Sequence, residues 1–558
     1  MKAFEFKPKL YTALKNYSKE LFMADLMAGI IVGIVALPLA IAFGIASGVS
    51  PEKGIITAII AGFIISMLGG SKVQIGGPTG AFIVIIYGII QQYGEAGLIV
   101  ATLMAGVILI LLGVFKLGAV IKFIPYPIIV GFTSGIAVTI FTTQIADIFG
   151  LNFGGEKVPG DFVGKWIIYF NHFDTINWWN TIVSIVSITI IAITPKFSKK
   201  IPGSLIAIIV VTVAVYLMKT YGGITCIDTI GDRFSIKAEL PDAVMPSLNW
   251  EAIKNLFPVA ITIAVLGAIE SLLSATVADG VIGDKHDSNT ELIAQGAANL
   301  VTPLFGGIPA TGAIARTMAN INNGGKTPVA GMVHAVVLLL ILVVLMPYAA
   351  LIPMPTIAAI LFMVAYNMSG WRKFVYLLKT APKSDIIVLV LTFGLTVVFD
   401  LVVAIEVNVV LAAMLFMKRM SEETAVEGWK YVESDDDDPD SINLRDVAKN
   451  IRVYELSGPL FFGAADKIAE IHAKDFNNCL ILRMRSVNAI DATAMHALEL
   501  LWEKCQKKNV TLIFSHVNEQ PMSAMKKSGL YDKVGAENFC EHIDDALERG
   551  AELGESRQ

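Results

Sequence analysis

Charged residues and cysteines are both scarce in this chain of 558 residues, and each shortage excludes a class of function. Only 16% of the residues are charged, against about 25% in an ordinary soluble domain. The four cysteines are Cys226, Cys479, Cys505 and Cys540. They lie far apart and form no C-x-x-C pair, which excludes a disulfide framework and a cysteine-based metal site. The net charge is -5 and most of the acid lies toward the C-terminal end, so no nucleic-acid-binding surface is expected.

The sequence also lacks the patterns that enzymes use. We find no cluster of metal-ligating residues, no nucleophile–base pair and no phosphate-binding loop. We therefore predict a protein that is not an enzyme and that carries no cofactor or metal. The N-terminus is polar and basic and its first apolar run belongs to a membrane span, so no cleavable signal peptide is expected.

Long apolar runs dominate the rest of the sequence. Hydrophobic residues make up 55% of the chain, and its mean hydropathy is +0.66. Runs of membrane-spanning length predict an α-helical polytopic membrane protein embedded in a lipid bilayer. Fourteen segments are expected, at 27–46, 53–69, 79–91, 97–115, 120–148, 179–195, 203–218, 258–279, 290–304, 310–321, 327–346, 349–367, 384–399 and 401–418.

Lysines between these segments indicate the orientation in the membrane. The connections after even-numbered segments carry Lys72, Lys116, Lys285, Lys326 and Lys418, and the N-terminal segment 1–24 is also rich in lysine. Basic residues favour the cytoplasmic side of a membrane. Both termini are therefore expected in the cytoplasm, in agreement with an even number of spans.

Two similar stretches rich in glycine and proline interrupt the apolar pattern. Gly76–Ala81 opens the third segment and Gly306–Ala313 opens the tenth. These are equivalent positions in two repeats of seven spans, and because seven is odd, the second repeat is inverted. Two half-helices would then meet head to head and present their amide groups to an anion. The alternative is that glycine and proline only kink packed helices.

Single polar residues in the apolar segments are further candidates for the site. Glu270 is the only acid between Ile261 and Ala278, and Ser274 follows one helical turn later. Burial favours the neutral form of a carboxyl group, so Glu270 is a candidate proton carrier, or else a protonated residue that only bonds a neighbouring helix. Arg316 either adds positive charge behind the half-helices or extends toward the cytoplasm. Phe43 either caps the pocket or packs against lipid and core.

Several motifs together resemble the SulP/SLC26 anion transporter family. They are Leu37–Pro51, Gln74–Gly80 and Gly324–Pro328, and the likeness covers essentially the whole chain. Gly267–Ser274, Lys285–His286 and Gly312–Arg316 most resemble the bacterial branch that couples C4-dicarboxylate transport to protons. The resemblance implies the plasma membrane of a bacterium, which is the inner membrane in a Gram-negative cell.

The resemblance also implies a core domain and a gate domain with the anion bound between the third and tenth helices. The substrate-binding residues that it implies are Phe43, Thr79, Gly80, Ala81, Gly312, Ala313, Ala315 and Arg316. It further implies that Glu270 and Ser274 couple transport to a cation. Sodium-dependent bicarbonate relatives carry Asp and Thr at these two positions, so we expect protons rather than sodium.

The last quarter of the chain changes to a soluble pattern. The predicted domains are a cytoplasmic N-terminal segment at 1–24, a transporter domain at 25–420, an acidic linker at 421–449 and a small cytoplasmic α/β domain at 450–558. Strands are expected at Ile451–Leu456, Cys479–Met484 and Val510–Ser515, with helices at 464–472 and 492–508.

This α/β region resembles a STAS domain, whose loop presents a phosphorylated hydroxyl group in some relatives. Thr493 occupies the hydroxyl position, while Asp491 is alternatively an ordinary helix cap. The resemblance implies a regulatory domain that supports homodimers, together with the membrane domain.

Three classes of function remain after these steps. A secondary active anion symporter explains the paired half-helices, Glu270 and Arg316 together. A channel or uncoupled exchanger of the same architecture needs no titratable Glu270, and a membrane-embedded sensor or enzyme has no supporting motif. The expected substrate is a small anion such as a C4-dicarboxylate, bicarbonate or sulfate, and the co-transported ion is a proton, with sodium as the alternative.

Overall fold

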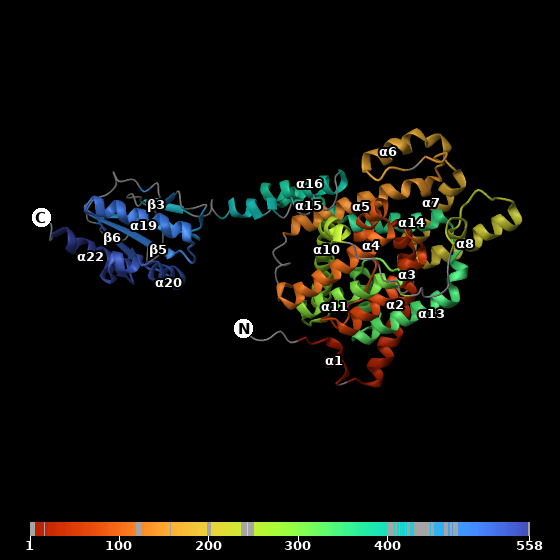
Figure 1. Cartoon of the computed structure of the whole chain (residues 1–558), viewed down its shortest axis with the longest axis horizontal. Coiled ribbons are helices and arrows are strands. Elements are labelled where there is room, and N and C mark those ends of the chain that lie inside the picture. The colour runs from red at the N-terminus through yellow and green to blue at the C-terminus, as the bar shows by residue number, and fades with distance from the viewer. Residues whose placement is uncertain are drawn as a thin grey trace. The chain divides into compact units, whose positions relative to one another are not determined.

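The protein has two units, Met1–Val409 and Val410–Gln558 (Figure 1). The first is helical and the second is built on a β-sheet. This computed structural model describes residues 6–15, 17–118, 125–156, 158–197, 202–235, 250–398, 413–418, 425–428, 451–462 and 478–555, with a few isolated positions between them.

The helical unit has two sets of elements. The first set is α1 (Lys9–Leu14), α2 (Lys19–Ala46), α3 (Pro51–Leu68), β1 (Gly76–Gly77), η1 (Gly80–Phe82), α4 (Ile83–Val114), α5 (Tyr126–Phe149), α6 (Phe162–Asn171), η3 (Phe173–Thr175), α7 (Trp178–Phe197), α8 (Gly203–Gly222) and α9 (Ile230–Arg233). The second set is α10 (Trp250–Ile282), α11 (Ser288–Val301), η4 (Thr302–Phe305), β2 (Thr311–Gly312), α12 (Ile314–Asn322), α13 (Pro328–Ala349), α14 (Met354–Ser369), α15 (Trp371–Thr380) and α16 (Lys383–Val398).

The first thirteen predicted segments all coincide with helices of this unit. The third and fourth form the two arms of α4, which turns at Gly94 through a left-handed backbone conformation (φ 67°). Nine helices in the described part of the chain are long and apolar enough to cross a membrane. Helices α11 and α12 are shorter than that, and α16 is described only as far as Val398. The fourteenth segment, 401–418, lies mostly outside the described residues.

The helices pack as two groups, as the core-and-gate prediction requires. Helices α2, α3, α4, α10, α11, α12 and α13 pack mainly on one another and form the core group. Helices α5, α7, α8, α14 and α16 form the gate group. Each group takes its helices from both repeats.

The described helices begin before residue 25, the predicted start of the transporter domain. Helix α2 starts at Lys19 instead of residue 25, and α1 is tied to the end of α3 because the Lys9 amide donates to the Gly69 carbonyl (2.9 Å). We call the side of the helical unit that carries α1 the inner side and the side that carries α6 the outer side (Figure 1).

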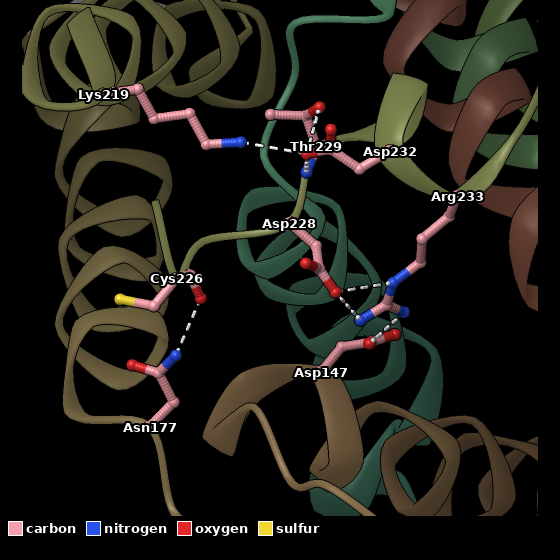
Figure 2. Close-up of polar contacts among 8 residues, drawn as sticks. All are labelled: Asp147, Asn177, Lys219, Cys226, Asp228, Thr229, Asp232 and Arg233. Carbon is pink, nitrogen blue, oxygen red and sulfur yellow. Dashed lines mark hydrogen bonds and ion pairs between the residues drawn. The ribbon is translucent and has the colours of Figure 1, made fainter. Parts of the chain in front are cut away.

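A polar network on the outer side joins the connection before α10 to the gate group (Figure 2). The Arg233 guanidinium lies 2.6 Å from the Asp147 carboxylate at the end of α5 and 3.1 Å from the Asp228 carboxylate. The Ile230 amide also donates to the Ile352 carbonyl between α13 and α14 (2.9 Å). Two of the connections between the core group and the gate group, before α10 and before α14, are thus held together.

The second unit contains a five-stranded sheet in the order β3-β4-β5-β6-β7. Its strands are β3 (Ala425–Gly428), β4 (Ile451–Ser457), β5 (Cys479–Ser486), β6 (Thr511–Ser515) and β7 (Phe539–Cys540). Strand β3 pairs antiparallel and the others pair parallel. Among the residues that the structure describes in this unit, the helices are α19 (Ala492–Lys507), α20 (Glu519–Ser528), α21 (Leu530–Val534) and α22 (Ile543–Glu555).

Alternate residues of the central strand face two separate hydrophobic cores. Leu480 and Leu482 pack with α19, α20 and α21, whereas Cys479 and Ile481 pack with α22. This confirms the predicted α/β domain and its three strands. Strand β3 falls inside the predicted linker 421–449, so the sheet takes up part of that acidic segment. The predicted helix at 464–472 lies largely outside the described residues.

Candidate functional site

The two glycine-rich stretches pair with each other in the middle of the helical unit. Strands β1 and β2 form a two-stranded antiparallel sheet, with Gly76 opposite Gly312 and Gly77 opposite Thr311. Strand β1 leads through η1 into α4, and β2 leads into α12. The starts of two helices from the two repeats therefore meet at one place, which is the arrangement predicted from the inverted repeats.

Each helix start offers amide groups that have no acceptor within their own helix. The first-turn amides of an α-helix lack intrahelical partners and carry the positive end of its dipole. Ala315, the second residue of α12, is exposed, and Thr79, Gly80 and Ala81 at the start of η1 are buried. Two such ends that face one centre favour a negatively charged ligand.

Glycine is needed in both strands because other groups approach closely. A Cβ atom at Gly312 would lie 1.6 Å from the Gln74 amide nitrogen. At Gly77 the backbone has a φ of 147°, and a Cβ atom would lie 2.3 Å from the Arg316 guanidinium. The glycine pattern thus reflects the close approach of the Gln74 and Arg316 side chains to the strands, in addition to a kink.

Glu270 touches the start of the third helix. The Thr79 hydroxyl donates a hydrogen bond of 2.9 Å to a Glu270 carboxylate oxygen. Glu270 is half-buried, so it is not sealed inside the helix packing. A titratable group therefore lies directly beside the helix start that would hold the anion.

Arg316 is buried and braces the opposite strand. Its side chain is 2% exposed, and its guanidinium donates to the carbonyl oxygens of Gly76 and Pro78. The side chain therefore points across to β1 and does not extend toward the cytoplasm, which was the alternative expectation.

Hydroxyl groups that the sequence reasoning missed hold the two strands in place. The Ser271 hydroxyl lies 2.6 Å from the Thr311 hydroxyl and accepts from the Gly312 amide (3.1 Å). The predicted Ser274 donates to the Thr317 hydroxyl (3.3 Å), which in turn accepts from the Ile75 amide (3.0 Å). Ser271 precedes Ser274 by three residues and therefore lies on the same face of α10, so the sequence does show this polar helix face. It does not show that β2 packs against that face.

Phe43 and the gate group close the other side of the helix starts. A Cβ atom at Gly80 would lie 3.3 Å from Met368 Sδ in α14, 3.6 Å from Ile140 Cδ1 in α5 and 3.7 Å from Phe43 Cε1 in α2. The predicted Phe43 is therefore adjacent to the site. Ala313 is buried, and its amide donates to the Ile75 carbonyl (2.9 Å), so this residue contributes to the strand pairing.

The last predicted residue, Thr493, lies far along the chain in the second unit. It is exposed in the first turn of α19. Asp491 caps this helix by accepting from the Ala494 amide (2.9 Å), and it also accepts from the Phe462 amide (2.9 Å). The helix-cap role of Asp491 is confirmed, and phosphorylation of Thr493 stays a prediction. No group of three potential metal ligands occurs among the described residues.

Comparison with known proteins finds matches to both units. The model of the Sulfate permease family matches residues 22–392, and the STAS domain model matches residues 445–546. A putative sulfate transporter of Bacillus subtilis, YvdB, is 42% identical over 95% of this chain and 98% of its own length. The bicarbonate transporter BicA of a Picosynechococcus strain is 32% identical, with 90% of each chain covered.

Two solved structures have a similar fold. The murine solute carrier 26 member A9 anion transporter in the inward-facing state aligns with a TM-score of 0.86, at 20% identity, over 98% of this chain and 94% of that chain. The transmembrane domain of a cyanobacterial BicA aligns with a TM-score of 0.61, at 28% identity, over 71% of this chain and 98% of that domain.

Proposed function

This chain belongs to the sulfate permease family, and we propose that it is a secondary active transporter that carries a small anion together with a proton. Relatives named as sulfate and bicarbonate transporters support anion transport. The candidate substrates are sulfate, bicarbonate and C4-dicarboxylates. Neither the relatives' names nor the helix starts distinguish these anions, because amide groups and helix dipoles recognise negative charge in general.

One observation carries the proposal. The half-helix starts of η1–α4 and α12 meet at the β1–β2 pair, and the Glu270 carboxylate is hydrogen-bonded to Thr79 at that same place. Protonation of Glu270 removes a negative charge beside the anion, so anion binding and proton binding favour each other. Their joint release on the other side of the membrane gives symport.

The rest of the molecule has proposed roles that follow from this one. The inner side faces the cytoplasm across a bacterial plasma membrane, and both termini are proposed to be cytoplasmic, as the lysine-rich connections indicate. The STAS unit regulates transport and supports a homodimer together with the membrane unit, and the exposed Thr493 is its candidate phosphorylation site.

Uptake into proteoliposomes tests the coupling. Labelled sulfate, bicarbonate and fumarate are offered with an imposed proton gradient, an imposed sodium gradient or neither. Wild type is expected to respond to the proton gradient, and Glu270→Gln is expected to lose that response while it still binds the anion. Uptake that follows only the sodium gradient supports sodium-coupled bicarbonate symport instead. Uptake that ignores both gradients and survives Glu270→Gln supports an uncoupled exchanger or channel.

A further inference from the structure

Lys165 on the outer side is a buried lysine, which is unusual for this residue type. Its side chain is only 5% exposed, although lysine is almost never buried unless it is paired. Its ammonium donates to the Gly160 carbonyl (2.8 Å) and lies 5.1 Å from the centre of the Tyr87 ring. Burial lowers the pKa of the Lys165 ammonium, and the charge of Asp161 opposes this shift. Because burying an ammonium costs folding stability, Lys165 is expected to have a function in addition to packing α6.

Tyr87 lies on α4, in the segment that starts at the anion site. It follows Gly80 by seven residues through η1 and the first turns of α4, about 10 Å along the helix axis. Gly80 lies near Met368 of α14 and Ile140 of α5, which both belong to the gate group. Tyr87 lies near Lys165 of α6, which packs on the gate group. The η1–α4 segment therefore borders the gate group at both points, with the anion site at one end and Tyr87 toward the outer side.

The Lys165–Tyr87 contact bridges the two helix groups. Helix α6 packs on α5 and α16 of the gate group, whereas Tyr87 belongs to α4 of the core group. The ring is supported from the core side, because a Cβ atom at Gly48 would lie 3.2 Å from Tyr87 Cδ2. Any movement of the gate group away from the core group at this end must separate the ammonium from the ring.

We propose that Lys165 and Tyr87 form the outer gate of the anion route, and that Lys165 binds the entering anion when this gate opens. The inference rests on the proposed anion transport, since the route leads to the β1–β2 site. In the closed state the ring face and the Gly160 carbonyl satisfy the ammonium. Once the ring has moved away, a small oxyanion or carboxylate replaces it as the better partner of a poorly hydrated cation.

The lysine is tested by uptake into intact cells, with sulfate, bicarbonate or fumarate, whichever wild type takes up best. Lys165→Met is expected to raise the KM for the external anion about tenfold, since a charge-assisted hydrogen bond is lost. Its KM for efflux from the inside should stay unchanged, whereas a purely structural defect would alter both directions. Lys165→Arg keeps the charge and should stay within about twofold of wild type.

Lys53→Met is the matched control, because Lys53 of α3 also lies on the outer side but pairs with Glu95 of α4 (2.6 Å), within the core group. It should leave the external KM unchanged. If Lys165→Met keeps the wild-type external KM, or if Lys53→Met raises it equally, Lys165 is not an anion-binding gate residue.

The gate itself is tested by thiol labelling, which does not depend on transport. A reporter Ile140→Cys is placed in a Cys226→Ser background, and a membrane-impermeant reagent is added from outside. Tyr87→Leu should speed the labelling and Tyr87→Phe, which keeps the ring, should not. Equal rates in all three proteins would overturn the gate. Failure of wild type to transport any of the three anions would instead overturn the proposed function, whatever the labelling shows.

Discussion

The Thr79 hydroxyl donates a 2.9 Å hydrogen bond to the Glu270 carboxylate, and this bond joins the start of the third helix to the only acid in the apolar stretch Ile261–Ala278 of α10. Thr79 is 6% exposed, so water competes little for the bond. A change in the protonation state of Glu270 therefore alters the hydrogen bond that Thr79 makes at the helix start. This contact is the physical link between the coupling group and the anion site.

Removal of the Thr79 hydroxyl is expected to weaken coupled transport. Thr79→Val has the same shape but no hydrogen-bond donor, and a bond to a charged group contributes about 1.5–3 kcal/mol. Proton-driven uptake should fall about tenfold or more, measured as the initial rate in proteoliposomes. Thr79→Ser keeps the hydroxyl and serves as the control with near wild-type uptake. Equal rates for the Val and Ser variants would show that the bond has no part in coupling.

Arg316 is expected to affect both affinity and stability. Arg316→Gln removes a buried positive charge near the site and the bonds to the Gly76 and Pro78 carbonyls. Anion affinity should fall about tenfold or more, and the thermal unfolding midpoint should also fall. Arg316→Lys keeps the charge but cannot bond two carbonyls in the same way, so it should retain more affinity than the Gln variant. Equilibrium binding of the labelled anion and a thermal melt measure the two effects separately.

Asp25 on the inner side is expected to be essential for stability. This fully buried carboxylate accepts hydrogen bonds from the Lys326 and Thr327 amides (2.8 and 3.0 Å) and from the Tyr17 hydroxyl (3.0 Å). Asp25→Ala leaves these donors buried without an acceptor and should cost about 3 kcal/mol or more. A thermal melt of the purified protein is the measurement. A midpoint within the error of wild type would contradict this role.

Asp232 in the outer network gives a pH-dependent prediction. Hydrogen bonds from Lys219 and then from Thr229 lower the pKa of Asp232 to about 2. A lowered pKa adds stability above the unfolded value near 4, and that stability is lost as the pH falls toward 2. The difference in melting point between wild type and Asp232→Asn should be constant from about pH 5 to pH 8 and should shrink below about pH 4. Because half of the Asp232 side chain is exposed, the effect should stay within about 1 kcal/mol.

Asp174→Asn provides the control for this prediction. Asp174 is an exposed aspartate on the same outer side, in η3. Its replacement should leave the melting point unchanged over the same pH range. A difference between wild type and Asp232→Asn that grows on acidification would show that the sign is wrong.

Much of the fold was predictable because membrane spans and strands leave strong periodic signals. Thirteen segments and three strands follow from apolar runs, and the inverted repeats follow from the matched positions of Gly76–Ala81 and Gly306–Ala313. The start of α2 at Lys19 was missed because its first turn is polar and extends beyond the apolar run. Strand β3 was missed because a short edge strand inside a charged stretch has no pattern of its own.

The site was predictable at its backbone and less so at its supporting side chains. Helix-breaking glycine and proline and an isolated acid occur in membrane-spanning segments mainly where they line a cavity or contact polar partners, so they mark the site in the sequence. The roles of Ser271 and Thr317 depend on which strand lies against α10 and α12, and this information comes only from the tertiary packing. The same holds for Arg316, whose target carbonyls lie about 240 residues earlier in the chain.

The most direct test of the claim that the anion binds at the β1–β2 helix starts is anion binding to a variant in which a bulky side chain blocks one of these starts. Gly80→Val adds bulk where the nearest atoms are Met368 Sδ, Ile140 Cδ1 and Phe43 Cε1, and so fills the space in front of the amides. Gly88→Val is the control, because Gly88 is exposed two turns later on α4 and a Cβ atom there meets nothing within 4 Å. Equilibrium binding of labelled sulfate, bicarbonate or fumarate should be lost in Gly80→Val and kept in Gly88→Val. Wild-type affinity in a correctly folded Gly80→Val protein would show that the anion binds elsewhere.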